Sequence, residues 1–210
     1  MTAEGKLGVL KSIEAHSLSC IRGGRLVFRD VGFRVEAGRT LSLEGPNGAG
    51  KSSLLRMIAG FLAPAAGVLV LQSDGAEISD GEERGHFIGW LGHHDAAKPQ
   101  LTPRETLRFF ADLYGVSGDI DGALVEVGLS RASDLPCQYL SAGQKKRLSL
   151  ARLKLSNRAL WLLDEPLAAL DTAGKSLAAQ FISSHVASGG IAIVATHEAL
   201  GIDAARLALA

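Results

Sequence analysis

The sequence contains little cysteine, since Cys20 and Cys137 are the only two among its 210 residues. Two cysteines cannot build a framework of disulfides, and neither lies in C-x-x-C or C-x-x-C-H spacing. The spacing therefore gives no sign of covalent haem attachment or of a structural zinc site. A cysteine content this low fits a chain that works in a reducing cytosol.

Long apolar runs and an excess of either charge are also absent. The longest apolar runs, residues 159–163 and 191–195, have five residues each, which is too short to span a bilayer. Residues 4–14 carry four charges and no unbroken apolar segment, so we expect no signal peptide. Lys plus Arg and Asp plus Glu both number 22, so no overall field attracts nucleic acid or anionic lipid. We expect any membrane role to be peripheral, through a partner.

Two segments depart from this even distribution of charge. The acidic stretch 74–83 is interpreted as a solvated face. The basic stretch 145–158 directly follows a motif described below, so a solvated face and a nucleic-acid contact both stay open for it.

A glycine-rich segment of the form G-x-x-x-x-G-K-S begins at Gly45. The alternating run 40–43 before it predicts a strand, and the helical spacing of apolar residues in 53–59 predicts a helix that stops at Gly60. This context is typical of a loop that cradles phosphates with backbone N–H groups and a helix N-terminus. An accidental glycine-rich turn is the alternative, which the context disfavours. The expected nucleotide-binding residues are Gly45, Pro46, Asn47, Gly48, Ala49, Gly50, Lys51, Ser52 and Ser53.

Chemical roles follow from these residue types. Lys51 supplies a positive charge to the β- and γ-phosphates, and the Ser52 hydroxyl is a ligand for Mg²⁺. A buried strand over 159–163 ends in Asp164 and Glu165, and such a strand end opens into the ligand crevice of a parallel sheet. We expect Asp164 to hold the Mg²⁺ shell and Glu165 to polarise the attacking water. The alternative is an acidic helix start at Pro166, which the phosphate loop disfavours.

Hydrophobic periodicity and turn residues predict an α/β chain with a largely parallel core sheet. The expected order is strands with turns over 10–44, the phosphate loop and its helix, strands at 68–71 and 86–91 around a polar loop 72–85, helices at 102–115, 120–127 and 141–156, and strands at 159–163 and 191–195 with a helix between them.

The segment Leu140, Ser141, Ala142, Gly143, Gln144 resembles the LSGGQ signature of ATP-binding cassette (ABC) ATPases, with Ala142 in place of glycine. Ser141 caps the helix that follows, and Gly143 permits close backbone approach. Asp171, after Ala168-Ala169-Leu170, resembles the D-loop of the same family. Thr196-His197 resembles its switch histidine, which contacts the γ-phosphate. Five motifs occur in family order, and the resemblance covers essentially the whole chain.

This resemblance implies a P-loop NTPase fold in one domain, residues 1–210. Its core sheet would be mainly parallel, with an antiparallel β subdomain and a helical subdomain at about 95–157. It implies ATP and Mg²⁺ as ligands, and Glu165 and His197 as catalytic residues. It also implies a homodimer in which ATP lies between the phosphate loop of one subunit and Ser141–Gln144 of the other. Integral-membrane permease subunits would hold the dimer at the cytoplasmic face of the inner membrane.

Two positions depart from the family pattern. His93 or His94 stands where the family usually has a glutamine, so the metal and water contacts of that position are open. Neighbouring positions on a strand face opposite ways, which disfavours a haem or metal site at this pair. No aromatic residue lies near Arg22, where the family usually stacks one on adenine. The guanidinium plane of Arg22 is a candidate replacement, and we expect weak adenine selectivity.

Four short stretches resemble the haem-exporter-type ATPases of cytochrome c maturation, and these are 18–20, 44–51, 91–94 and 140–144. The resemblance implies ATP hydrolysis that drives haem export or haem-chaperone handling. Because the chain has no C-x-x-C-H and no convincing pair of haem ligands, we expect that it binds no haem itself, and its balanced charge gives no reason to expect nucleic acid as a partner. Three alternatives stay open: an exporter ATPase for another substrate, an ABC ATPase without membrane subunits that acts on nucleic acid, and a nucleotide-binding regulator without turnover.

Overall fold

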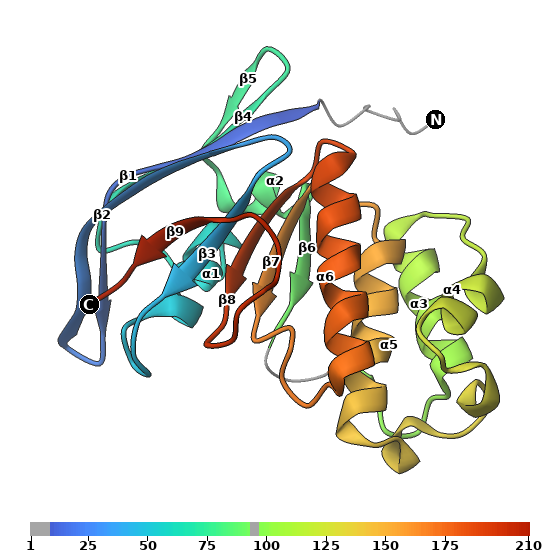
Figure 1. Ribbon diagram of the computed structural model, residues 1–210. Helices are drawn as coiled ribbons and strands as arrows, with labels where there is room; N and C mark the ends of the chain where they lie inside the picture. The colour runs from blue at the N-terminus through green and yellow to red at the C-terminus, as the bar shows by residue number, and fades with distance from the viewer. Residues whose placement is uncertain (1–8, 93–96) are drawn as a thin grey trace.

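The computed structural model describes residues 9–92 and 97–210, and it contains two β-sheets with helices on both sides of the larger one (Figure 1). The larger sheet has five strands in the order β6-β7-β8-β3-β9, and every neighbouring pair is parallel. The smaller sheet has four antiparallel strands in the order β2-β1-β4-β5. The predicted α/β architecture with a mainly parallel core sheet is confirmed.

The antiparallel sheet comes from residues 10–78. Its strands are β1 Leu10–Arg22, β2 Arg25–Glu36, β4 Ala66–Ser73 and β5 Ala76–Ile78. The turn predicted at Gly23-Gly24 is confirmed, since both glycines have positive φ. The predicted strands in this region are too short, and the polar loop predicted at 72–85 is wrong. That segment holds β5 and the short helix α2 Gly81–Gly85. Most side chains in both elements are exposed, so the sequence there has no hydrophobic periodicity that would predict a strand or a helix.

The core sheet is built from short buried strands, which are β3 Thr40–Glu44, β6 Ile88–Leu91, β7 Leu160–Asp164, β8 Ile191–Ala195 and β9 Ala205–Ala208. Alternate residues of β7 enter opposite cores: Leu160 and Leu162 face the antiparallel sheet, whereas Trp161 and Leu163 face the helices. Strand β9, with mostly exposed residues, is a strand that the sequence pattern did not predict.

The helices are α1 Lys51–Ile58, α3 Pro103–Tyr114, α4 Ile120–Glu126, α5 Ala142–Leu155 and α6 Thr172–Ala187, with short 3₁₀ turns at Ser130–Ala132 and Cys137–Tyr139. Helix α1 packs into the core shared by the two sheets, and α3 to α6 lie on the other side of the core sheet (Figure 1). The predicted capping box at Thr102 is confirmed, and Gly115 ends α3 with φ 66°.

This arrangement brings distant motifs to one edge. In a parallel sheet the carboxyl ends of all strands lie at the same edge, so the segments after β3, β7 and β8 are neighbours. No helix in the described part of the chain combines the length and the apolar character that crossing a bilayer requires.

Candidate functional site

The phosphate loop follows β3 directly and leads into α1. Gly45, Gly48 and Gly50 all have positive φ, which other residues rarely adopt. A Cβ at Gly50 would lie 2.6 Å from Val27 Cγ1, so only glycine lets the loop pack against strand β2. Lys51 is buried, and its Nζ donates to the carbonyl oxygens of Gly45 at 2.7 Å and Pro46 at 3.0 Å. The loop itself thereby fixes the ammonium group beside the expected phosphate position.

Helix α1 lacks a side-chain cap at its N-terminus, where Gly50 adopts a left-handed conformation. The other α-helices of the described residues each have one, supplied by Asp80, Thr102, Asp119, Ser141 or Asp171. The first turn of α1 also carries no acidic residue. Its free N–H groups and the positive end of its dipole therefore form a site for an anion, and triphosphate oxygens fit that site.

A hydrogen bond joins two motifs that are 112 residues apart. The hydroxyl of Ser52, on α1, donates to Oδ1 of Asp164 at 3.0 Å, and Asp164 is buried at the end of β7. In the described residues no group of three His, Cys, Asp or Glu side chains could by itself hold a metal ion. A hydroxyl and a carboxylate are the hard oxygen donors that suit Mg²⁺ when phosphates and water complete its shell.

Glu165 and His197 form the second pair at this edge. His197 Nε2 lies 3.5 Å from Glu165 Oε1, and both side chains are partly exposed. Glu165 has φ 50°, and its backbone N–H donates to Ala195 O of β8 at 2.8 Å. This contact ties the two segments that leave β7 and β8. The strained backbone conformation at Glu165 is maintained by the surrounding sheet, as is common for residues of a reactive site.

These groups share one cleft of about 960 Å³. It is lined by Arg22, Val27, Asn47, Gly48, Gly50, Lys51, Ser52, Ser53, Arg56, Phe61, Trp90, Gly92, Asp164, Glu165, Ala168 and His197. Its volume lies in the range of ordinary ligand sites. The phosphate-loop residues, the acidic pair and the switch histidine, all predicted from sequence, are therefore brought together in one place.

The signature segment lies elsewhere, because none of Leu140–Gln144 lines that cleft. Ser141 and Gln144 form a capping box, with Ser141 Oγ accepting from the Gln144 N–H at 3.2 Å. A Cβ at Gly143 would lie 2.9 Å from the carbonyl oxygen of Ala169, so this glycine permits close contact with the D-loop segment of the same chain.

Asp171 holds the end of that D-loop segment. Its Oδ1 accepts from the Gly174 N–H at 2.8 Å and pairs with Arg147 of α5 at 2.6 Å. The hydrogen bond from Gly174 and then that from Arg147 hold the pKa of the Asp171 carboxyl below its usual range. Asp171 thus fixes α6 to the helix that follows the signature segment.

Four cleft residues belong to none of the sequence motifs, namely Val27, Arg56, Phe61 and Trp90. Phe61 is 70% exposed and meets Trp90 edge-on, with ring centroids 5.6 Å apart. Phe61 differs from an ordinary core aromatic only in that its side chain is exposed just after the end of α1. Exposure cannot be read from the sequence. His93 and His94 lie outside the described residues, although Gly92 before them lines the cleft.

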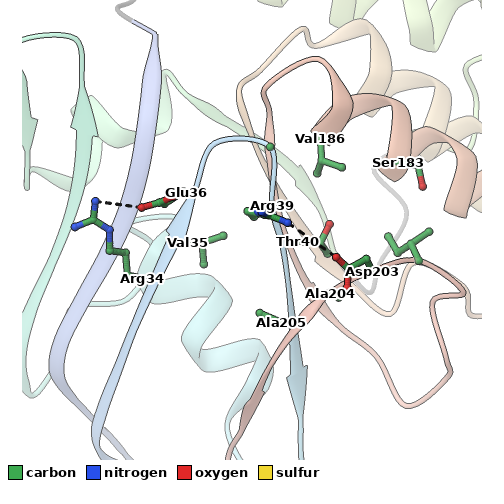
Figure 2. Close-up of a pocket in the computed structure, with 12 residues that line it drawn as sticks. Arg34, Val35, Glu36, Arg39, Thr40, Ser183, Val186, Asp203, Ala204 and Ala205 are labelled. Carbon is green, nitrogen blue, oxygen red and sulfur yellow. Dashed lines mark ion pairs between the residues drawn. The ribbon is translucent and has the colours of Figure 1, made fainter.

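A second cleft, of about 630 Å³, lies at the opposite end of β3 (Figure 2). Arg39 and Asp203 face each other across it at 4.0 Å, and Thr40, Val35 and Val186 line it. It contains no residue of any motif described above, so we assign no chemistry to it.

The fold and the cleft define a P-loop nucleotide-binding domain. The family model described as "ABC transporter" matches residues 28–168. A protein of Rhodopseudomonas palustris named "Cytochrome c biogenesis ATP-binding export protein CcmA" is 48% identical over 93% of this chain and 96% of its own length. The protein of the same name from Bradyrhizobium diazoefficiens is 47% identical over 90% and 92%.

A solved structure, a putative ABC transporter ATP-binding protein from Pyrococcus furiosus, superposes with a TM-score of 0.82 at 25% identity, over 94% of this chain and 97% of that one. The chain therefore belongs to the ABC transporter family, within its CcmA group of ATP-binding proteins. The family resemblance carried by its motifs is confirmed.

Proposed function

We propose that the chain is the ATP-hydrolysing subunit of a membrane ABC complex, and that hydrolysis powers the haem export or haem-chaperone step of c-type cytochrome biogenesis. The observation that carries the proposal is the meeting of Lys51, the Ser52–Asp164 pair and the Glu165–His197 pair in one cleft. The relatives named for cytochrome c biogenesis supply the biological context.

In the proposed reaction, Lys51 and the free N–H groups of α1 bind the β- and γ-phosphates. Ser52 and Asp164 would hold Mg²⁺, and that ion would supply charge neutralisation at the phosphates. Glu165 accepts a proton from the water whose oxygen bonds to the γ-phosphorus, while the bond from that phosphorus to the bridging oxygen breaks. His197 donates a hydrogen bond to the γ-phosphate, and its contact with Glu165 keeps the two side chains together.

The position of the signature segment supports a homodimer. Residues Leu140–Gln144 lie outside the cleft of their own chain, and the exposed N-terminus of α5 at Ser141 is suited to an anion. We propose that Ser141–Gln144 of a second copy closes the ATP site, with Asp171 and the D-loop at the interface.

The remaining assignments concern organisation and partners. We propose one domain over 1–210, with α3, α4 and α5 forming a helical subdomain at about 95–157, and His93 or His94 in the usual glutamine position. We place the chain peripherally at the cytoplasmic face of the inner membrane, on permease subunits of the CcmB and CcmC kind. The exposed ring of Phe61 is a candidate contact for such a subunit. Changing Phe61→Ser should stop co-purification from detergent-solubilised membranes, and ATP binding is measured in parallel because Phe61 also lines the cleft.

A strain carrying Lys51→Ala tests the biological role. It should lose holo-cytochromes c while it keeps b-type cytochromes, and the purified wild-type chain should show no haem absorbance. Lys154→Ala is the matched control, because Lys154 pairs with Glu126 on the surface and does not line the cleft. Normal haem attachment in the Lys51→Ala strain would refute the cytochrome c role and leave the ATPase assignment intact.

The basic stretch 145–158 motivates the alternative of a nucleic-acid partner. Its side chains are largely engaged within the protein: Arg147 pairs with Asp171, Lys154 with Glu126, and Arg152 donates to Trp90 O. This engagement favours the structural interpretation of the stretch. RNA binding that weakens with rising salt would reverse that preference.

A further inference from the structure

Arg84 is a buried arginine on the short helix α2, and its side chain reaches the far end of the phosphate-loop helix. Its Nε donates to the carbonyl oxygen of Ile58 at 3.3 Å, and its Nη2 donates to that of Met57 at 3.3 Å. These are the last residues of α1, whose carbonyls have no partner within the helix. Arg84 therefore caps the C-terminus of the helix whose N-terminus forms the phosphate site.

The remaining hydrogen bonds of Arg84 go to strand β4 and to the loop between β5 and α2. Nη1 donates to Leu69 O of β4 at 3.4 Å and also to Ser79 O. In the described structure every hydrogen-bond acceptor of this guanidinium is a main-chain carbonyl. Burial lowers the pKa of Arg84, and the nearby Asp80 charge partly offsets that effect. Because an arginine stays charged even when buried, a cation lies at the C-terminal end of α1, which is the negative end of the helix dipole.

Two glycines make this contact possible. Gly60 ends α1 with φ 79°, and a Cβ there would lie 2.7 Å from the carbonyl oxygen of Gly81. The end of α1 and the start of α2 are therefore in backbone contact, which places Arg84 directly against the last turn. Asp80 fixes α2 in turn, since its carboxylate accepts from the Glu82 and Glu83 N–H groups.

We propose that Arg84 is a positioning residue for the ATP site, which acts through α1. Helix α1 has eight residues and is about 12 Å long at 1.5 Å per residue, so its two ends are close and move together. A cation at one end and phosphates at the other both align with the helix dipole. Without the guanidinium, α1 loses the hydrogen bonds that fix the position of its C-terminal end between the two sheets.

The test measures MgATP affinity in the purified full-length chain, by calorimetry at a temperature where circular dichroism shows each variant folded. Arg84→Met keeps side-chain bulk and removes the charge and all donors, while Arg84→Lys keeps the charge and loses the forked geometry. Arg104→Met is the matched control. Arg104 also joins several segments, through Asp121, Asp134 and Ser133, but it lies on α3 and does not contact α1.

We expect Arg84→Met to bind MgATP about tenfold more weakly, Arg84→Lys about threefold more weakly, and Arg104→Met within twofold of wild type. KM for ATP should rise in the Arg84 variants while kcat changes less than twofold, because Arg84 contacts neither Glu165 nor His197. If Arg84→Met does not fold, the MgATP affinity of Arg84→Lys tests the role of Arg84 instead.

The role of Arg84 rests on the proposed ATPase function, but different results would refute the role and the function. A wild-type chain that does not bind MgATP would refute the function. Wild-type affinity in a folded Arg84 variant, or an equal loss in Arg104→Met, would overturn the role of Arg84 while the function stands.

Discussion

His185 of α6 stacks on Trp161 of β7, with ring centroids 4.0 Å apart and ring planes 3° from parallel. Its Nε2 lies 3.2 Å from the carbonyl oxygen of Ile191. Burial lowers the pKa of His185 from 6.5 to about 4, and the nearby carbonyl oxygens of Ile191 and Ala159 only partly oppose that effect. The folded protein therefore keeps this imidazole neutral at pH values where the unfolded chain protonates it.

The sign and size of the effect on stability follow from this difference. As the pH falls below 6.5, the unfolded chain binds a proton at His185 and the folded protein does not, so the free energy of unfolding decreases. The decrease continues until the folded pKa of about 4 is reached. At 1.36 kcal/mol per pH unit the total loss is about 3 kcal/mol, a large share of the 5–15 kcal/mol typical of whole domains.

Urea unfolding followed by tryptophan fluorescence, at several pH values between about 7 and 4.5, measures this loss. His185→Phe keeps an aromatic ring against Trp161 and cannot titrate, so its unfolding free energy should fall by about 2 kcal/mol less over that range. The His185 ring lies directly against the backbone of Gly190, since a Cβ there would be 2.2 Å from His185 Cε1. The larger phenyl ring of His185→Phe would therefore be crowded. A constant loss at every pH is therefore expected as well, and only the pH slope is diagnostic.

His16→Gln is the comparison variant, because it removes an exposed histidine and leaves His185 in place. Equal slopes for wild type and His185→Phe would refute the reasoning and would mean that the imidazole is hydrated in the folded state.

Further predictions concern the ATP site. Glu165→Gln should keep ATP binding, abolish turnover and accumulate an ATP-bound dimer in gel filtration, whereas Lys51→Ala should lose binding and turnover; persistent hydrolysis in Glu165→Gln would remove that residue from its role. Mixing Ser141→Arg with Lys51→Ala chains should restore part of the ATPase activity, and full specific activity in a dilute monomer would contradict the shared site. GTP and ATP should bind within about tenfold of each other, with Arg22→Tyr favouring ATP; a strong ATP preference in wild type would point to another base contact.

The local parts of the site were predictable because the motif itself dictates their geometry. Glycines at fixed spacing specify the loop before Lys51, and a buried apolar run specifies a strand that ends at Asp164. The meeting of Ser52 with Asp164 across 112 residues also followed, once the pattern indicated a parallel sheet with its strand ends at one edge.

Other features depend on tertiary contacts that a pattern does not contain. Strand β9 is mostly exposed and pairs with β3 only after the chain folds back. The capping of α1 by Arg84 requires residues 57 and 84 to meet through backbone contact of two glycines. The same holds for Phe61 and Trp90, whose place in the cleft depends on where α1 ends relative to β6.

The uncapped start of α1 also bears on how the protein behaves without nucleotide. Because bound phosphate satisfies N–H groups that no side chain satisfies, ligand binding adds to the unfolding free energy, by about 2.7 kcal/mol at a ligand concentration one hundred times Kd. Melting temperature thus becomes a direct report of site occupancy. Sulfate or phosphate in a purification buffer would occupy the same N–H groups, raise the melting temperature and compete with ATP in any affinity measurement.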